Sequence, residues 1–350
     1  MTGRERILAA LDGLEPDRAG CALSFYRVEL DGLALAGRRL AAIDVEFVTF
    51  PLAPDEEALG RAAQPYPPDT RLGTHAQVAT YARWHYRPHD ARRANPLALA
   101  RSLEELRAFP FPAVAPHAGV AELTAQVRAL HGRGLAAGGN LPHLGGELFE
   151  AAWRLRGLEN FLVDLRRRPE WAHFLLDRLS ELACRNARSL ALAGIDVLAL
   201  DDDVGMPGTM MISPATWREF FRPRLGAIIE AARAIAPGLR VLYHSDGYIE
   251  PIVGDLVALG VNAINPLQPE YMDAARIRRE FGPRLALWGT VGRQTTFSSA
   301  TPREIRQEVK ERVGTLGRAG LVLCPAYDID EPDVRPENVA AFLDAVEAYG

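Results

Sequence analysis

The chain has 350 residues, of which 48% are hydrophobic and 24% are charged. This composition is typical of a folded globular protein and excludes a disordered or fibrous chain. The formal net charge is -5, and acidic and basic residues are interleaved along the chain, so nucleic acid is not an expected partner.

The sequence carries no signal for secretion or for insertion into a membrane. Residues 1–13 lack the continuous apolar core of a signal peptide, and no later stretch approaches the roughly 20 apolar residues of a membrane span. Cys21, Cys184 and Cys324 are odd in number and far apart, which favours a reducing compartment over a disulfide framework. We therefore expect a soluble, cytoplasmic protein with no membrane partner.

Residues 42–50 are compatible with a strand, and residues 81–90 with a loop or hairpin. Residues 96–112 suggest an irregular connection, a short helix and a turn.

After about residue 135, short apolar runs that end in polar residues alternate with helical segments. The runs comprise residues 135–140, 196–203, 240–247, 262–269, 285–290 and 320–328. Their nearly continuous apolar residues are typical of strands buried on both faces of a parallel sheet.

Helix-start signals separate these runs. Pro169 stands where a long helix would begin, and Ser213 precedes Pro214 as an N-cap would. Residues 301–304 contain a capping box with proline at the first helical position. The strand count and the absence of a Gly-rich dinucleotide fingerprint favour a (β/α)8 TIM barrel, formed by residues 1–350 as one domain, over an open sheet.

Every recognised strand is followed by polar residues. These are Asn140 with His143, Asp201 to Asp203, His244 with Ser245 and Asp246, Asn265 with Gln268, Thr290 with Gln294, and Tyr327 with Asp328. Any one of them also suits a cap or a turn. Because barrel enzymes assemble their active sites at the carboxyl ends of the strands, the repeated pattern indicates a shared site.

Asp201, Asp202 and Asp203 place three successive carboxylates at one barrel mouth. Like charges at short range raise at least one pKa, which provides a general acid or base. The alternative is that one carboxylate caps the following turn and another faces solvent.

His244 and Asp246 stand two residues apart, so a strand places both on one face. Together they can relay protons near neutral pH or bind a metal. The alternative is a histidine that only fixes the following loop. Tyr327 can donate a hydrogen bond to a developing anion, and Met210 can line an apolar or flat ligand, although packing also explains each of them.

Several segments carry a family resemblance. They are GELFEAAWRLRGLENFLVDL from Gly146, AGIDVLALDDDVG from Ala193, MISPATWREFFRPRL from Met211, YHSDGYIEPIVGDLVALGVNAINPLQPEYMD from Tyr243 and PENVAAFLDAVEAYG from Pro336. Together they resemble the uroporphyrinogen decarboxylase superfamily, especially its branch with corrinoid-linked methyltransferases. The resemblance implies a soluble barrel, a homodimer, and a mouth that includes Asp202, Asp203, His244, Asn265, Gln268 and Gln294.

The resemblance implies two chemistries. The family's decarboxylases act on a porphyrinogen without a cofactor and use arginines to hold carboxylates, whereas its methyltransferases bind zinc through a His-x-Cys pair and a later cysteine. This chain lacks the arginine-rich N-terminal motif, since Arg18 and Arg27 are the nearest basic residues. It also carries Asp246 in place of the first cysteine, and Tyr327 near the second.

A metal in this chain would therefore have harder ligands, such as His244, Asp246 and one of Asp202 and Asp203. Metal-free acid/base chemistry is the simpler expectation. The sequence thus predicts a carboxy-lyase, with no cofactor, that acts on a tetrapyrrole-like or other carboxylated small molecule.

In this lyase, Asp202 or Asp203 protonates the carbon that loses CO2, and His244 with Asp246 tunes or shuttles that proton. The substrate is oriented by Tyr327 and Gln268, and further contacts are expected from Asn140, His143, Met210, Asn265, Gln294 and Asp328. One alternative is a methyltransferase that acts with a corrinoid protein or folate and has an altered metal site. Another is a non-catalytic barrel that binds a tetrapyrrole or another anion.

Overall fold

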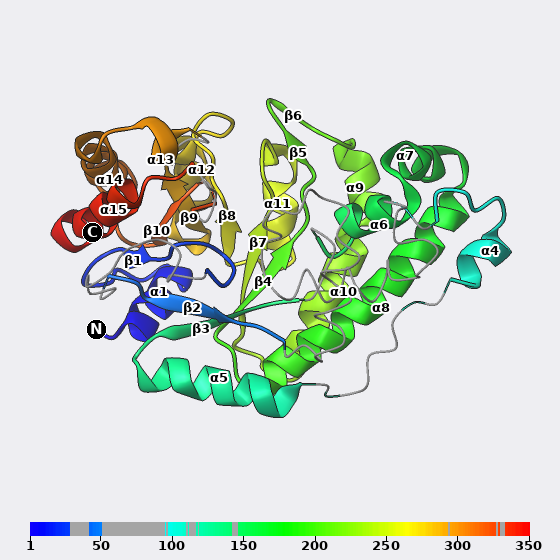
Figure 1. Cartoon of the computed structure of the whole chain (residues 1–350), viewed down its shortest axis with the longest axis horizontal. Helices are drawn as coiled ribbons and strands as arrows, with labels where there is room; N and C mark the ends of the chain where they lie inside the picture. Colours follow the sequence, from blue (N-terminus) through cyan, green and yellow to red (C-terminus); the bar gives the residue numbers. More distant parts are fainter. Residues whose placement is uncertain are drawn as a thin grey trace.

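The computed structural model describes residues 1–28, 42–50, 95, 97–109, 111, 117, 119–141, 146–292, 295–326, 328–329 and 333–350. Within these residues, eight parallel strands form a nearly closed barrel that is surrounded by helices (Figure 1). The strands are β1 (Gly20–Cys21), β2 (Val45–Val48), β3 (Ala136–Asn140), β4 (Val197–Asp201), β7 (Arg240–His244), β8 (Ala263–Asn265), β9 (Ala286–Val291) and β10 (Leu321–Pro325). The predicted (β/α)8 fold is confirmed.

The barrel strands lie side by side in chain order. The sheet order is β1-β10-β9-β8-β7-β4-β3-β2, and each neighbouring pair is parallel. Parallel neighbours require a crossover connection, which explains why helices separate most strands in the sequence. All eight carboxyl ends therefore face the same rim of the barrel.

The helices surround the strands, and several extend beyond them. They are α1 (Gly3–Leu11), α4 (Leu103–Arg107), α5 (Val120–Gly132), α6 (Phe149–Arg156), α7 (Leu158–Arg167), α8 (Pro169–Ala193), α9 (Pro214–Phe220), α10 (Arg222–Arg233), α11 (Glu250–Ala258), α12 (Ala274–Phe281), the 3-10 helix η2 (Gly282–Arg284), α13 (Thr296–Ser299), α14 (Pro302–Leu316) and α15 (Pro336–Tyr349). In Figure 1, α6, α7 and α9 lie around one end of α8, on the side away from α14 and α15. No helix among the described residues is long and apolar enough to span a membrane.

The helix starts that the sequence predicts are confirmed. The side chain of Ser213 accepts a hydrogen bond from the Thr216 amide at the start of α9, and Pro169 opens α8. Thr301 and Glu304 form the capping box of α14. These side chains satisfy amides that a helix cannot pair internally.

Strand side chains alternate between the barrel interior and the layer of helices. Val197 and Ala199 of β4 belong to the apolar cluster inside the barrel, whereas Leu198 and Leu200 belong to the cluster that packs under the helices. This period of two continues past the end of the apolar run. It determines which polar side chain after β4 enters the mouth of the barrel and which one turns outward.

Asp44 joins the first and second strands, which are the two ends of the sheet. Its amide donates to the Cys21 carbonyl oxygen at 2.9 Å, and its Oδ2 accepts from the Cys21 amide at 2.9 Å. The same buried carboxylate accepts hydrogen bonds from Arg6 and Arg18. These contacts hold β1 beside the start of β2, where no continuous ladder connects the two strands.

The sequence did not predict β1 or the small hairpin of β5 (Gly205–Met206) and β6 (Thr209–Met210). Each of these strands has two residues, which is too short to show a periodic pattern. The strand expected over residues 42–50 is present as β2 within that range.

Candidate functional site at the carboxyl rim of the barrel

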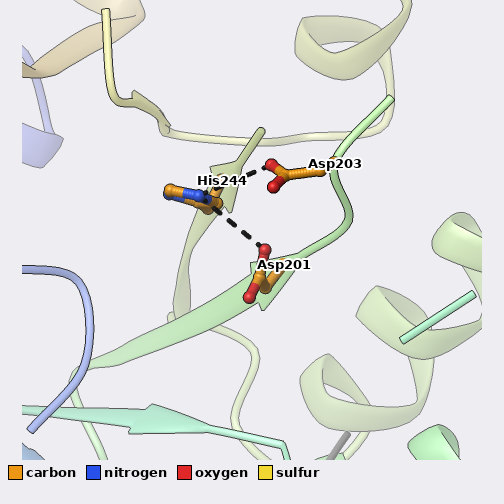
Figure 2. A group of neighbouring side chains, drawn as sticks. All are labelled: Asp201, Asp203 and His244. Carbon is orange, nitrogen blue, oxygen red and sulfur yellow. Dashed lines mark ion pairs between the residues drawn. The ribbon is translucent and has the colours of Figure 1, made fainter. Parts of the chain in front are cut away.

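The carboxyl ends of adjacent strands bring an imidazole and several carboxylates together. Asp201 is the last residue of β4, and His244 is the last residue of β7. The Nε2 atom of His244 lies 3.6 Å from Asp203 Oδ1, 3.9 Å from Asp201 Oδ1 and 4.0 Å from Asp246 Oδ1. Figure 2 shows Asp201 and Asp203 converging on the ring of His244. These separations exceed ordinary hydrogen-bond lengths, so space remains between the groups.

Asn265, at the end of β8, sets the orientation of His244. The Nδ2 of Asn265 donates to the Trp288 carbonyl oxygen at 3.3 Å, which turns its Oδ1 toward His244 Nδ1 at 2.6 Å. An amide oxygen only accepts, so Nδ1 carries a proton, and Nε2 is the ring nitrogen that faces the carboxylates. Asn265 was predicted to bind substrate; in this structure its side chain contacts His244 and Trp288.

Phe25 covers one face of the His244 ring. The two rings stack with their centroids 3.7 Å apart at an interplanar angle of 16°. Asn140 Nδ2 donates to the Phe25 carbonyl oxygen at 3.0 Å, which holds the segment after β1 over the barrel. Asn140, another predicted substrate contact, therefore lies at the site and supports Phe25.

Asp202 points away from this cluster and caps α6. Its Oδ2 accepts from the Phe149 amide at 2.8 Å, and its Oδ1 accepts from the Glu150 amide at 3.0 Å. In the opposite direction, Glu147 Oε2 accepts from the Asp201 amide at 2.6 Å. The end of β4 and the start of α6 thus exchange carboxylates, and we call this arrangement the carboxylate clasp of Glu147 and Asp202.

Two further predicted residues fix the loop after β7. Asp203 Oδ1 accepts from the Asp246 amide at 2.6 Å, and Gln268 Oε1 accepts from the Gly247 amide at 2.7 Å. Gln268 is buried, whereas the side chain of Asp246 is about half exposed at the rim. Asp203 and Gln268 therefore help to hold Asp246 near His244.

Of the five remaining predicted residues, the structure describes two. Met210 is buried in β6, in the hairpin that follows Asp203, and Asp328 is exposed after β10. His143, Gln294 and Tyr327 lie outside the described residues.

Burial and mutual repulsion favour the protonated forms of the acids at this rim. Burial, followed by repulsion from Asp203 and Glu147, raises the pKa of Asp201 well above its ordinary value. Burial raises the pKa of Asp202 to about 7, although the amides of α6 oppose this change. Burial also raises the pKa of Glu150 to about 8. Without a compensating positive charge, these groups retain protons near neutral pH.

In protein stripped of metal, we expect the free energy of unfolding to fall as pH rises from about 5 to about 8. The raised pKa values of Asp202 and Glu150 mean that the folded state binds more protons than the unfolded state in this window, so the slope is negative. Each buried group contributes at most about 1.4 kcal/mol per pH unit. Urea unfolding midpoints in a chelator-containing buffer measure the slope, and a rise in stability with pH would contradict this account.

The donor set fits a divalent cation. One ligand atom each from Asp201, Asp203 and His244 lies within 4.8 Å of the others. Metal–ligand distances of about 2.0–2.2 Å place ligand atoms about 3.0–3.5 Å apart in octahedral or tetrahedral shells. The distances of 3.6 and 3.9 Å from Nε2 to the two carboxylates therefore require only a small contraction. Two carboxylates and an imidazole suit Mn²⁺, Co²⁺ or Zn²⁺ better than a soft, thiolate-preferring ion.

The sequence predicted a role for the three carboxylates of residues 201–203 but assigned the chemistry to Asp202 or Asp203, and it did not predict Glu147 or Phe25. The strand period was a usable signal for Asp201, because it lies two residues before Asp203 and two after the inward-facing Ala199. Glu147 and Phe25 reach the rim from segments that follow other strands. No local pattern in the sequence connects either residue with His244.

Comparisons with known proteins agree on one family. Residues 149–349 match the sequence model of the family "Uroporphyrinogen decarboxylase (URO-D)". The chain is 27% identical over 175 residues to the methylcobamide:CoM methyltransferase MtaA of Methanosarcina barkeri, covering 50% of this chain and 48% of that protein. It is 26% identical over 185 residues to the uroporphyrinogen decarboxylase of Chlorobium limicola, covering 52% and 50%. The chain thus spans about half the length of these curated relatives.

A solved structure covers more of the chain. A methyltransferase from Methanosarcina mazei superposes with a TM-score of 0.69 over 100% of this chain and 99% of its own, at 20% identity. At this identity the likeness shows a shared fold.

Proposed function

We propose that the chain, which belongs to the uroporphyrinogen decarboxylase family, is a methyltransferase whose site at the carboxyl rim of the barrel holds a divalent cation. The observation that carries this proposal is the convergence of Asp201 and Asp203 on His244 Nε2. The family's decarboxylases act without a cofactor, so a donor set suited to a cation favours the transferase branch.

Asp201, Asp203 and His244 would be the protein ligands of the cation. When bound, the cation acts as a Lewis acid that lowers the pKa of an acceptor such as a thiol. Asn265 keeps the proton of His244 on Nδ1, so Nε2 stays available, and Phe25 shields one face of the ring from water.

Asp246 suits the role of proton acceptor. Although its side chain is about half exposed, desolvation at the crowded rim, followed by repulsion from Asp203 and Glu270, raises the pKa of Asp246 above its ordinary value, which makes its carboxylate a better acceptor for the proton of the acceptor group. Its position at the rim also lets the proton pass on to solvent.

The methyl donor would be a methylated corrinoid carried by a partner protein. This part of the proposal is supported by the relative that is named as a methylcobamide:CoM methyltransferase. A homodimer and a cytoplasmic location stay predictions.

Carboxy-lyase chemistry is a second candidate, and the raised pKa of Asp201 favours it. A protonated carboxyl at the barrel mouth could protonate the carbon that loses CO2. Asp201, rather than Asp202, would then be the acid, because both oxygens of Asp202 accept hydrogen bonds from α6. The substrate would be a tetrapyrrole-like or other carboxylated small molecule.

Metal analysis tests the leading proposal. We expect the purified protein to bind about one equivalent of Zn²⁺, Co²⁺ or Mn²⁺ per chain, and His244→Ala to lose it. Elemental analysis after dialysis and titration calorimetry measure both quantities. Methyl transfer from methylcobalamin to CoM should then require the cation. Protein that binds none of the three ions at micromolar concentration would refute the proposal, and CO2 release by such protein would favour the lyase.

A further inference from the structure

Glu147 is a buried acid that the proposed chemistry does not use. It lies in the loop before α6, and its side chain is almost fully enclosed. Its Oε2 accepts from the Asp201 amide at 2.6 Å, while its own amide donates to the Asp201 carbonyl oxygen at 2.8 Å. Two reciprocal hydrogen bonds therefore connect Glu147 with the residue that ends β4.

The loop is shaped for this contact. A Cβ atom at Gly146 would lie 2.7 Å from Asp202 Oδ1 and 2.8 Å from the Asp201 carbonyl oxygen, so a side chain there would push the loop away. Glycine at this position lets the backbone approach the end of β4.

Burial of a carboxylate here is costly. Glu147 Oε1 is buried and has no hydrogen-bond partner among the described residues, and Asp202 lies near enough to repel the group. A smaller neutral side chain would avoid this cost. A smaller side chain, however, would not reach the Asp201 amide as the glutamate does.

From these contacts we propose that Glu147 is a positioning residue for Asp201. By holding the Asp201 amide, Glu147 fixes the backbone position from which the Asp201 carboxylate faces the cation. The inference rests on the proposed cation site. It assigns to the clasp of Glu147 and Asp202 a role in the geometry of that site. The Glu147 side chain supports β4 from the loop, and the Asp202 side chain supports α6 from the strand.

The experiment separates the reach of the side chain from its charge. Glu147→Gln keeps an oxygen at the same reach, Glu147→Asp keeps the charge but shortens the side chain by one methylene, and Glu147→Ala removes both. Co²⁺ affinity by titration calorimetry and the visible spectrum of bound Co²⁺ are the measurements, because the spectrum reports ligand geometry and not folding. Glu308→Gln, in α14, is the control for loss of a carboxylate away from the rim.

We expect Glu147→Gln to bind Co²⁺ within about threefold of wild type with an unchanged spectrum. Glu147→Asp and Glu147→Ala should bind about 10 to 100-fold more weakly with altered spectra, as seen when the support of a metal ligand is removed. If Glu147→Ala does not fold, the Asp and Gln variants still decide the question. Wild-type affinity in Glu147→Asp, or weak binding in Glu147→Gln alone, would overturn the inference and leave the cation site intact. Wild-type protein that binds no Co²⁺ would overturn the proposed function as well.

Discussion

Asp201→Asn is expected to weaken binding of Mn²⁺ or Co²⁺ by at least about 100-fold, or about 3 kcal/mol. Asp201 Oδ1 lies 3.9 Å from His244 Nε2, and the substitution removes a negative charge from the proposed ligand set. Titration calorimetry at constant pH measures the change. Asparagine preserves the size and polarity of the side chain, so the fold should be little affected.

Asp202→Asn is the matched control, one residue along the chain. Its side chain caps α6 with both oxygens, and asparagine keeps only one of these acceptors, so we expect cation affinity within about threefold of wild type and a loss of about 1–3 kcal/mol of stability. The reverse result, with binding lost in Asp202→Asn and retained in Asp201→Asn, would show that the assignment of the two carboxylates is wrong.

The contrast between these neighbours shows what a single sequence can resolve at a strand end. The sequence indicated that polar tips gather at one rim, and Asp203, His244, Asn265 and Asp246 do lie near one another there. It did not indicate which of three adjacent carboxylates enters the barrel. That choice follows from the inward position of Ala199 on β4, which becomes certain only when the barrel interior is known.

The barrel could be predicted from Leu135 onward because each strand there is a buried apolar run, and helical segments separate most of these runs. The contacts that close the barrel could not. They involve Asp44, which pairs with Arg6 and Arg18 across intervals of 38 and 26 residues, and β1, which has two residues. Contacts of this kind link residues without a shared local pattern, so neither periodicity nor capping signals reveal them.

The roles of Asn265 and Asn140 illustrate a second limit. A polar residue at a strand end can contact the ligand, or it can hold the side chain that does. Asn265 holds His244, and Asn140 holds the segment that carries Phe25. A residue that contacts the ligand and a residue that supports another side chain can have the same type and the same position in the sequence, so only hydrogen-bond geometry distinguishes the two roles.

The clasp holds the start of α6, and a buried ion pair holds its end. Arg156, the last residue of α6, donates through Nε to Asp164 Oδ2 of α7 at 2.8 Å, and each side chain is only 2% exposed. Arg156 Nη1 also donates to the Leu97 carbonyl oxygen at 2.6 Å. The guanidinium further stacks over Trp171 of α8. One side chain therefore joins α6, α7, α8 and the segment before α4.

Arg156→Met is expected to lower the free energy of unfolding by about 3–5 kcal/mol. Methionine fills similar space but leaves the buried Asp164 carboxylate with less compensation and the Leu97 carbonyl oxygen without its donor. Urea unfolding at pH 7 measures the loss. Arg178→Met, which removes an exposed pair with Glu181 in α8, is the control and should cost less than about 1 kcal/mol.

The double variant Arg156→Met with Asp164→Leu determines how the loss arises. If an uncompensated buried charge is the main cause, removal of the carboxylate should recover a large part of the stability, because an apolar pair of similar volume often substitutes for a buried ion pair. No recovery would indicate instead that the backbone contacts of Arg156 dominate.

Because α6 begins at the clasp, Arg156→Met should also weaken cation binding, while Arg178→Met should leave it unchanged. Equal Co²⁺ affinity in folded samples of both variants would show that contacts at the end of α6 do not affect the cation site at the rim.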